Sequence, residues 1–290
     1  MKSALIKLHI AVFLWGFTGV LGRAIELNEG LLVWYRLLIT VISLLVLMKW
    51  QGVLQKIAFS TVLQLFGIGA IVALHWVCFY GSIKYANVSI ALICLSSAGL
   101  LSALLEPLMT TKKMVLVEVL LGLIGIAGIY LIFHFDASYR TGIVIGIASA
   151  IFSVVFSILN KKMVAEVAPK SMMLYELMGG FLVLSILMPL YLHYFPTTRI
   201  LPSNKDWLWL LLLSWVCTVY AMDLSLQALK KISAFTQNLT LNLEPVYGIL
   251  LAFFIYNENR NLSGSFYIGF ALILLAVSLQ MLRVLKLKRH

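Results

Sequence analysis

Residues 62–83 read VLQLFGIGAIVALHWVCFYGSI, and this stretch decides the fold. It contains no Lys, Arg, Asp or Glu. A helix needs about 20 predominantly apolar residues, at about 1.5 Å each, to cross the hydrocarbon core of a bilayer. The stretch therefore predicts a membrane-spanning helix.

Comparable stretches recur along the whole chain. Ten apolar segments are expected to span the membrane as helices: 4–24, 30–48, 62–83, 88–108, 115–134, 141–160, 172–194, 206–226, 232–255 and 263–284. The composition agrees, because the chain is 62% hydrophobic and 11% charged, whereas a typical globular domain is about 45–50% apolar and about 25% charged. The strands of a transmembrane barrel are shorter and alternate in polarity. We therefore expect an all-α polytopic membrane protein with ten transmembrane helices.

The Lys and Arg residues alternate between the gaps that separate these segments. One side receives Lys2, Lys7, Lys49, Lys56, Lys112, Lys113, Lys161, Lys162, Lys170, Lys230, Lys231, Arg283, Lys286, Lys288 and Arg289. The other side receives Arg23, Lys84, Arg140, Arg199, Lys205 and Arg260. Because Lys and Arg accumulate in cytoplasmic loops, we expect a multi-pass protein of the cell (inner) membrane with both termini in the cytoplasm. This topology explains the net charge of +11, so nucleic acid is not an expected partner.

Short similar stretches lie five segments apart. Trp76-Val77-Cys78 in the third segment resembles Trp215-Val216-Cys217 in the eighth. An odd number of helices per repeat inserts the second copy upside down, as in many secondary transporters, whose substrate site lies near the midplane between the halves. We therefore expect two inverted five-helix repeats, 1–136 and 137–290, within one membrane-embedded unit.

The ninth segment carries the densest run of polar residues, Thr236-Gln237-Asn238-Leu239-Thr240-Leu241-Asn242-Leu243-Glu244-Pro245. Pro245 lacks a backbone donor and clashes with the preceding turn, so we expect a helix break there. Backbone groups freed at membrane depth are tolerated where they line a cavity. The expected cavity residues of this segment are Gln237, Asn238, Asn242 and Glu244. The alternative is hydrogen bonding between helices that only holds the bundle together.

Other segments add candidates for the same cavity. His75 is an ionisable group at bilayer depth, which predicts a cavity-lining or proton-exchanging role; the alternative is a histidine bonded to the carbonyl of a neighbouring helix. Trp15, Thr18, Tyr80 and Trp215 are expected to supply aromatic and hydroxyl walls, and packing or interface anchoring is the alternative for each.

Three further charges lie inside the segments, and for them we favour structural roles. Arg36 is about two turns from the end of its segment, within reach of the interface by snorkelling. Glu176 occupies the corresponding position in the second half, and Asp223 is expected to pair with nearby lysines. Cys78, Cys94 and Cys217 lie in different segments without C-x-x-C spacing, so neither a disulfide framework nor a zinc site is expected.

Several of these residues together carry a resemblance to a known family. They are Ala11-Val12-Phe13-Leu14-Trp15-Gly16, Arg36, Ala86-Asn87-Val88-Ser89, Glu244-Pro245 and Asn257-Glu258. In their order and placement the chain resembles the drug/metabolite transporter superfamily, in its EamA family, over essentially its whole length. The resemblance implies a central cavity between inverted halves and export of amino acids, drugs or other metabolites. The fourth segment departs from the family in having Ser96-Ser97-Ala98 where a mid-helix proline is common.

The expected function is a secondary active transporter, an exporter of a small metabolite such as an amino acid or drug-like compound, by alternating access. The chain has no Walker A loop, so a gradient is expected to drive transport, with His75 or Glu244 as the candidate proton-linked group. No cofactor or metal is expected, and the expected partners are a small-molecule substrate and the lipid bilayer. The alternatives are an intramembrane enzyme, for which no paired acids or H-E-x-x-H motif stand out, and a non-transporting membrane scaffold.

Overall fold

The computed structural model describes residues 2–53, 55–111, 113–163, 166–229, 240–241 and 243–287. Nearly all of these residues are helical, and they include no strand. The prediction of an all-α protein is confirmed.

Within the described residues, helices lie at the positions of the predicted segments; residues 232–239 of the ninth segment are outside that part of the chain. The first half contains α1 (Lys2–Ala24), α2 (Glu29–Trp50), α3 (Phe59–Tyr85), α4 (Val88–Ser96), α5 (Ala98–Met109) and α6 (Leu116–Phe135). The second contains η1 (Ala137–Tyr139), α7 (Arg140–Met163), α8 (Pro169–Tyr194), α9 (Asn204–Leu211), η2 (Leu212–Tyr220), α10 (Ala221–Leu229), α12 (Glu244–Tyr256), η3 (Glu258–Arg260) and α13 (Gly264–Leu287). Among the described residues, seven spans are long and apolar enough to cross a membrane. The α4–α5 pair, bent by 47°, raises the number to eight.

Polar residues fix where several helices begin. The Asn28 side chain accepts a hydrogen bond from the Leu31 amide at the start of α2, and Asn87 accepts one from Ile90 at the start of α4. Ser203 and Asp206 form a reciprocal capping box at the start of α9. These side chains satisfy backbone donors that a helix leaves unpaired in its first turn.

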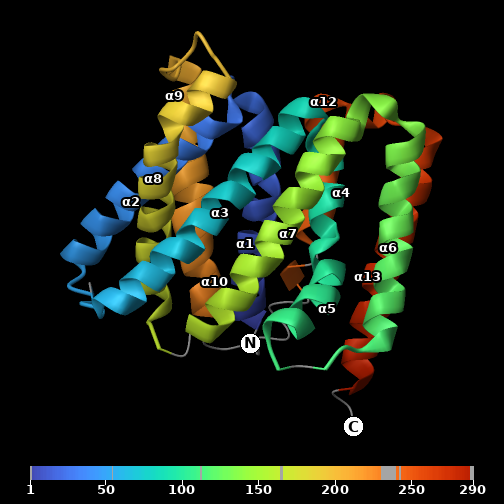
Figure 1. Ribbon diagram of the computed structural model, residues 1–290, viewed down its shortest axis with the longest axis horizontal. Helices are drawn as coiled ribbons and strands as arrows, with labels where there is room; N and C mark the ends of the chain where they lie inside the picture. Colours follow the sequence, from blue (N-terminus) through green and yellow to red (C-terminus); the bar gives the residue numbers. More distant parts are fainter. Residues whose placement is uncertain are drawn as a thin grey trace.

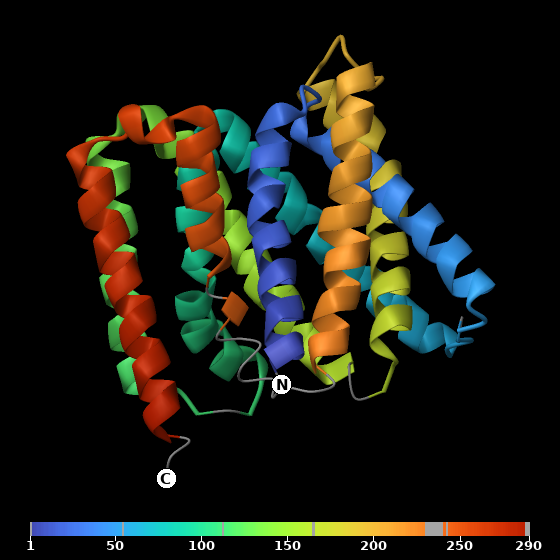
Figure 2. The same cartoon turned by 180° about the vertical axis from the view of Figure 1, so that it is seen from behind.

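The helices stand side by side, and the two chain termini lie at the same end of the bundle (Figures 1 and 2). We call this the termini end, marked by Lys2 of α1 and Leu287 of α13, and the other the Glu258 end, after the residue that opens η3. Helix α2 slants away from the bundle as it runs to the termini end (Figure 1).

The helix contacts are related by an exchange of segments five apart. α3 packs against α8, and α2 packs against η2; α5 packs against α7, and α1 packs against α12. α6 packs against α13 at one edge of the bundle. Exchanging the second segment with the seventh and the third with the eighth converts the α3–α8 contact into the α2–η2 contact. Exchanging the first with the sixth and the fourth with the ninth converts the α5–α7 contact into the α1–α12 contact. Two inverted five-helix halves would produce this pattern.

Candidate functional site

A buried arginine joins three helical segments inside the bundle. Arg36 of α2 is 4% exposed. Its Nη1 donates to the Tyr80 hydroxyl at 2.7 Å, and its Nη2 donates to the Thr218 hydroxyl at 3.0 Å. The guanidinium lies 3.6 Å from the centroid of the Trp76 ring. The expectation that Arg36 snorkels is wrong, because its charge is satisfied in place by polar and aromatic partners.

The partner segment η2 is π-helical, which widens the turn facing Arg36. The Thr218 hydroxyl donates to the Leu213 carbonyl at 2.9 Å while it accepts from Arg36. Ser214 donates to the Arg36 carbonyl at 3.3 Å. Long π-helical stretches are rare, and π-helical turns occur frequently at functional sites. The irregular helix therefore fits a position where side chains hold a charged group in place.

Glu244 is an ionisable group within electrostatic range of this arginine. The Glu244 carboxyl is in electrostatic interaction with Arg36 and with Tyr80. Helix α12 begins at Glu244, so Pro245 lies in its first turn, where a missing backbone donor costs little. Leu243 is in a turn, so α12 begins in the middle of the predicted ninth segment.

The fourth segment is interrupted at a comparable place. α4 ends at Ser96 and α5 begins at Ala98, and the Ser97 hydroxyl donates to the Cys94 carbonyl at 2.6 Å. Serine hydroxyls compete in this way for backbone acceptors. Discontinuous helices are the elements from which transporters form substrate sites near the midplane.

Helix α1 lies directly against the start of α12. A Cβ added to Gly16 would lie 2.9 Å from the Glu244 carbonyl oxygen, and one added to Gly248 would lie 2.8 Å from the Gly16 carbonyl oxygen. Only glycine permits this approach of two backbones. Trp15 of α1 and Leu243 both pack against the buried cluster that contains Leu8 and Val12, and Thr18, which is buried, donates to the Trp15 carbonyl at 2.6 Å.

His75 turns to another helix. Its Nδ1 lies 2.9 Å from both the carbonyl and the hydroxyl oxygen of Ser149 in α7. The Ser149 hydroxyl also donates to the His75 carbonyl at 3.0 Å. This is the structural alternative for His75, a histidine held by a neighbouring helix.

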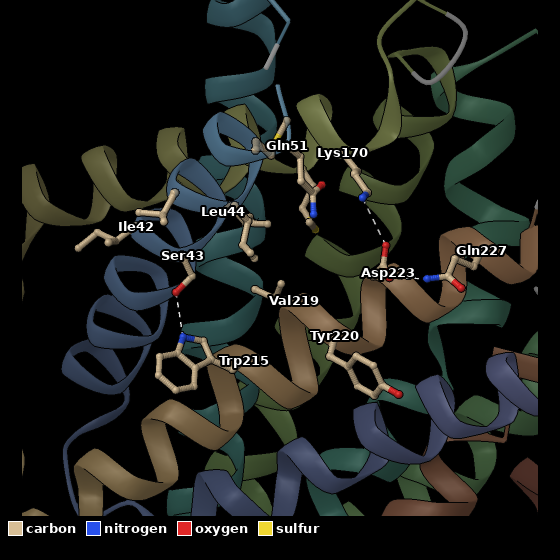
Figure 3. A pocket seen from close by; sticks show the side chains of 14 residues that line it. Ile42, Ser43, Leu44, Gln51, Lys170, Trp215, Val219, Tyr220, Asp223 and Gln227 are labelled. Carbon is tan, nitrogen blue, oxygen red and sulfur yellow. Dashed lines mark hydrogen bonds and ion pairs between the residues drawn. The ribbon is translucent and has the colours of Figure 1, made fainter. Parts of the chain in front are cut away.

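A groove of about 710 Å³ opens between α2, α8 and the η2–α10 segment toward the termini end (Figure 3). Its walls are mostly apolar, and at its polar end Lys170 forms an ion pair with Asp223 at 3.4 Å. Gln227 donates to the same carboxylate at 2.5 Å. Trp215, half exposed in the groove, donates to Ser43 at 2.8 Å. The predicted pairing of Asp223 with a lysine is confirmed.

The structure thus brings only part of the predicted site together. Tyr80 bonds Arg36, and Glu244 lies within electrostatic range of it. Trp15 and Thr18 lie on α1, which packs against α12, whereas His75 bonds α7 and Trp215 lines the groove. Gln237, Asn238 and Asn242 lie outside the described residues.

The polar centre around Arg36 contains three residues that the sequence did not single out as site candidates. Arg36, Trp76 and Thr218 form its best-connected part. The available signal was the high cost of an arginine at bilayer depth, which makes any such residue a site candidate. Among the described residues there is no group of three or more His, Cys, Asp or Glu that could hold a metal ion.

Comparison with known proteins gives a family match in each half. The sequence profile of the EamA-like transporter family matches residues 2–134 and again residues 140–282. A search of curated proteins finds no match. Among solved structures, a crystal structure described only as that of a "protein" superposes with a TM-score of 0.62 at 18% sequence identity. The superposition covers 97% of this chain and 98% of the other chain. At this identity the likeness shows the fold alone.

Proposed function

Since the chain belongs to the EamA-like transporter family, we propose that it is a secondary carrier that exports a small metabolite, such as an amino acid or drug-like compound, across the cell membrane. It works by alternating access around a site between its two halves. Both termini lie in the cytoplasm, so the termini end faces inward and the ten helical segments all cross the membrane.

One observation carries this proposal: a polar centre inside the bundle joins Arg36 to Tyr80 and to Thr218 of the π-helical segment, within electrostatic range of Glu244 at the start of α12. Arg36 comes from the first half, whereas Thr218 and Glu244 come from the second. Charged groups are expensive in hydrocarbon, and they face the bundle interior or a water-filled cavity when they serve transport. A packing role alone would not require an arginine and an ionisable acid inside the bundle.

The charges of this centre favour a zwitterionic or polar ligand. A guanidinium binds carboxylates through a planar fork of donors, and Glu244 offers an acceptor to an ammonium group. Tyr80, Trp76 and Thr218 hold the guanidinium from the side, so its position is fixed before a ligand arrives. Such preorganisation lowers the cost of binding.

The groove supplies access from the termini end. Its opening lies between α2 and the η2–α10 segment, and η2 also carries Thr218 of the polar centre. One helical segment therefore borders both the groove and the arginine. Movement of η2 against α2 would change access and ligand contacts together.

The test begins with ligand binding. The purified protein is screened by thermal shift against amino acids and other small metabolites, because a ligand that binds the native state at 100 times its Kd adds about 2.7 kcal/mol of stability. A stabilising compound is then radiolabelled, and its flux is measured in proteoliposomes. We expect uptake into vesicles that contain the protein and none in empty vesicles.

Substitutions separate a carrier from a scaffold. Arg36→Lys and Glu244→Gln should lower flux at least tenfold, about 1.4 kcal/mol, while the protein stays folded and monodisperse. Glu118→Gln is the matched control, since Glu118 lies on α6 in a half-exposed ion pair with Arg283, and it should retain flux. Unchanged flux in both site variants would disprove the assignment of this centre, and absence of binding and flux with every compound would support a scaffold.

A further inference from the structure

A second buried acid lies between α7 and α8, near the termini end. Glu176 of α8 is 6% exposed. The Asn160 amide nitrogen of α7 donates to Glu176 Oε2 at 3.2 Å. The remaining oxygens of the two side chains, Glu176 Oε1 and Asn160 Oδ1, are buried and have no hydrogen-bond partner. Two unpaired acceptors on one bonded pair are costly in a medium without water.

The pairing chemistry of these two groups identifies what is missing. An ionised carboxylate and an amide oxygen are both acceptors, so neither can satisfy the other. A protonated carboxyl has one O–H donor, which suits the amide oxygen, while the amide N–H bonds the second carboxyl oxygen. One proton on Glu176 Oε1 would therefore satisfy both unpaired atoms at once.

The charged groups on the neighbouring elements have other partners or lie at the surface. On α7, Lys161 pairs with Glu106, and Lys162 donates to the Met109 carbonyl. Lys170 of α8 pairs with Asp223, and His75 of α3 is bonded to Ser149. Lys49 is exposed, and Lys56 and Glu166 border a shallow pocket. α3 presents Gly69 to the backbone of Glu176, because a Cβ there would lie 2.7 Å from the Glu176 carbonyl carbon. A glycine offers no side chain that could pair with the acid.

We propose that Glu176 and Asn160 form a proton-binding site, in which one proton on Glu176 Oε1 is shared with the Asn160 amide oxygen, and that this proton couples transport to a proton gradient. The O–H bond forms with a proton taken from water on one side of the membrane and breaks when that proton is given to water on the other. Coupling in this sense rests on the proposed carrier function, whereas proton binding does not.

The position of the pair explains how binding would affect conformation. The acid–amide contact joins α7 to α8, and α8 also packs on α3, which carries Trp76 and Tyr80 of the polar centre. Loss of the proton leaves a buried charge whose oxygens lack donors. The α7–α8 contact must then open to water or to a lysine, so the proton favours the packing seen in the structure.

The first test measures the proton directly and needs no substrate. Infrared spectra of the purified protein at neutral pH should contain a carbonyl-stretch band of a protonated carboxylic acid. Glu176→Gln should remove this band, and Asn160→Ala should shift it, because the acid loses its acceptor. Glu118→Gln, on α6, should leave it unchanged. A band that persists in Glu176→Gln overturns the proposal, as does a band that disappears when sodium ions are added.

The second test measures coupling. Spin labels at Ile6→Cys of α1 and Trp50→Cys of α2, both exposed, report the distance between their termini ends in a background with the native cysteines replaced by alanine. This distance should differ between acidic and alkaline buffer in the otherwise wild-type protein and stay at its acidic value in Glu176→Gln. A pH response that survives Glu176→Gln overturns the coupling role. If the distance responds neither to pH nor to a ligand from the thermal-shift screen, the carrier proposal itself fails, and the infrared result still decides proton binding.

Discussion

The two ends of the bundle hold equivalent ion pairs in different ways. At the Glu258 end, Arg23 from the end of α1 pairs with Glu258, which follows α12. At the termini end, Lys161 from the last turn of α7 pairs with Glu106 near the end of α5, at 3.3 Å. Exchanging segments five apart converts one pair into the other.

Their surroundings are not equivalent. Glu258 is 2% exposed and accepts bonds from the Val88 amide at 3.0 Å, the Ser89 amide at 2.8 Å and the Ser89 hydroxyl at 2.6 Å. The carboxylate thus caps the N-terminus of α4, where an anion is stabilised by unpaired amides. In the Lys161–Glu106 pair, the lysine side chain is 66% exposed and the glutamate side chain 25%.

Under the proposed alternating access, this difference identifies the Glu258 end as the closed end. The Glu258 network joins α1, α4 and η3 through a buried carboxylate, whereas the groove opens at the termini end beside half-exposed charges. A carrier with inverted halves is expected to exchange these arrangements in its other state. Under the proposed alternating access, the bonds of Glu258 stabilise this state.

Glu258→Ala is expected to destabilise the protein more than any other substitution at the two ends. It removes an ion pair and leaves two α4 amides without their acceptor, so stability should fall by about 3 kcal/mol. The measurement is the unfolding midpoint in mixed detergent micelles. A Val20→Cys label site, buried one turn below Arg23, should become reactive toward a water-soluble thiol reagent. Unaltered stability and reactivity would show that this cluster does not close the Glu258 end.

The sequence predicted the positions of the helices better than the side-chain contacts between them. The positions of the described helices follow from apolar length, and the start of α12 next to Pro245 agrees with proline's preference for the first turn of a helix. The break at Ser97 could not be foreseen, because serine interrupts a helix only when its hydroxyl finds a backbone acceptor. The role of Arg36 depends on partners in two other segments, and the role of Glu258 as a cap depends on the amides at the start of α4. Neither role follows from the local sequence.

Ser89→Ala sharpens the comparison by removing one bond of Glu258. The hydroxyl is lost while the amide bond and the ion pair remain, so we expect about 1 kcal/mol of destabilisation. Detergent unfolding is again the measurement. Ser43→Ala is the control, because its hydroxyl bonds the half-exposed Trp215 and should contribute less. An equal loss of stability in the two variants would show that the buried hydrogen bond of Glu258 contributes no more than the half-exposed one.

Lys161→Ala tests the equivalent pair at the termini end. A pair with an exposed lysine contributes at most about 0.5 kcal/mol, and salt screens it. The unfolding midpoint should change little at low salt and not at all at high salt. A loss close to that of Glu258→Ala would mean that both ends are locked alike, which contradicts a state open at the termini end.

Asp223→Asn should have the smallest effect on stability and a measurable one on access. Its ion pair with Lys170 lies at the polar end of the groove, with both side chains more than a third exposed, so the free energy of unfolding should change by less than about 0.5 kcal/mol. The asparagine keeps an acceptor for Gln227 but no longer attracts Lys170, so α8 is held less firmly to α10. Thiol labelling at Met173→Cys, within the groove, should therefore be faster in Asp223→Asn than in an otherwise identical protein. Slower labelling would mean that the ion pair holds the groove open rather than restraining it.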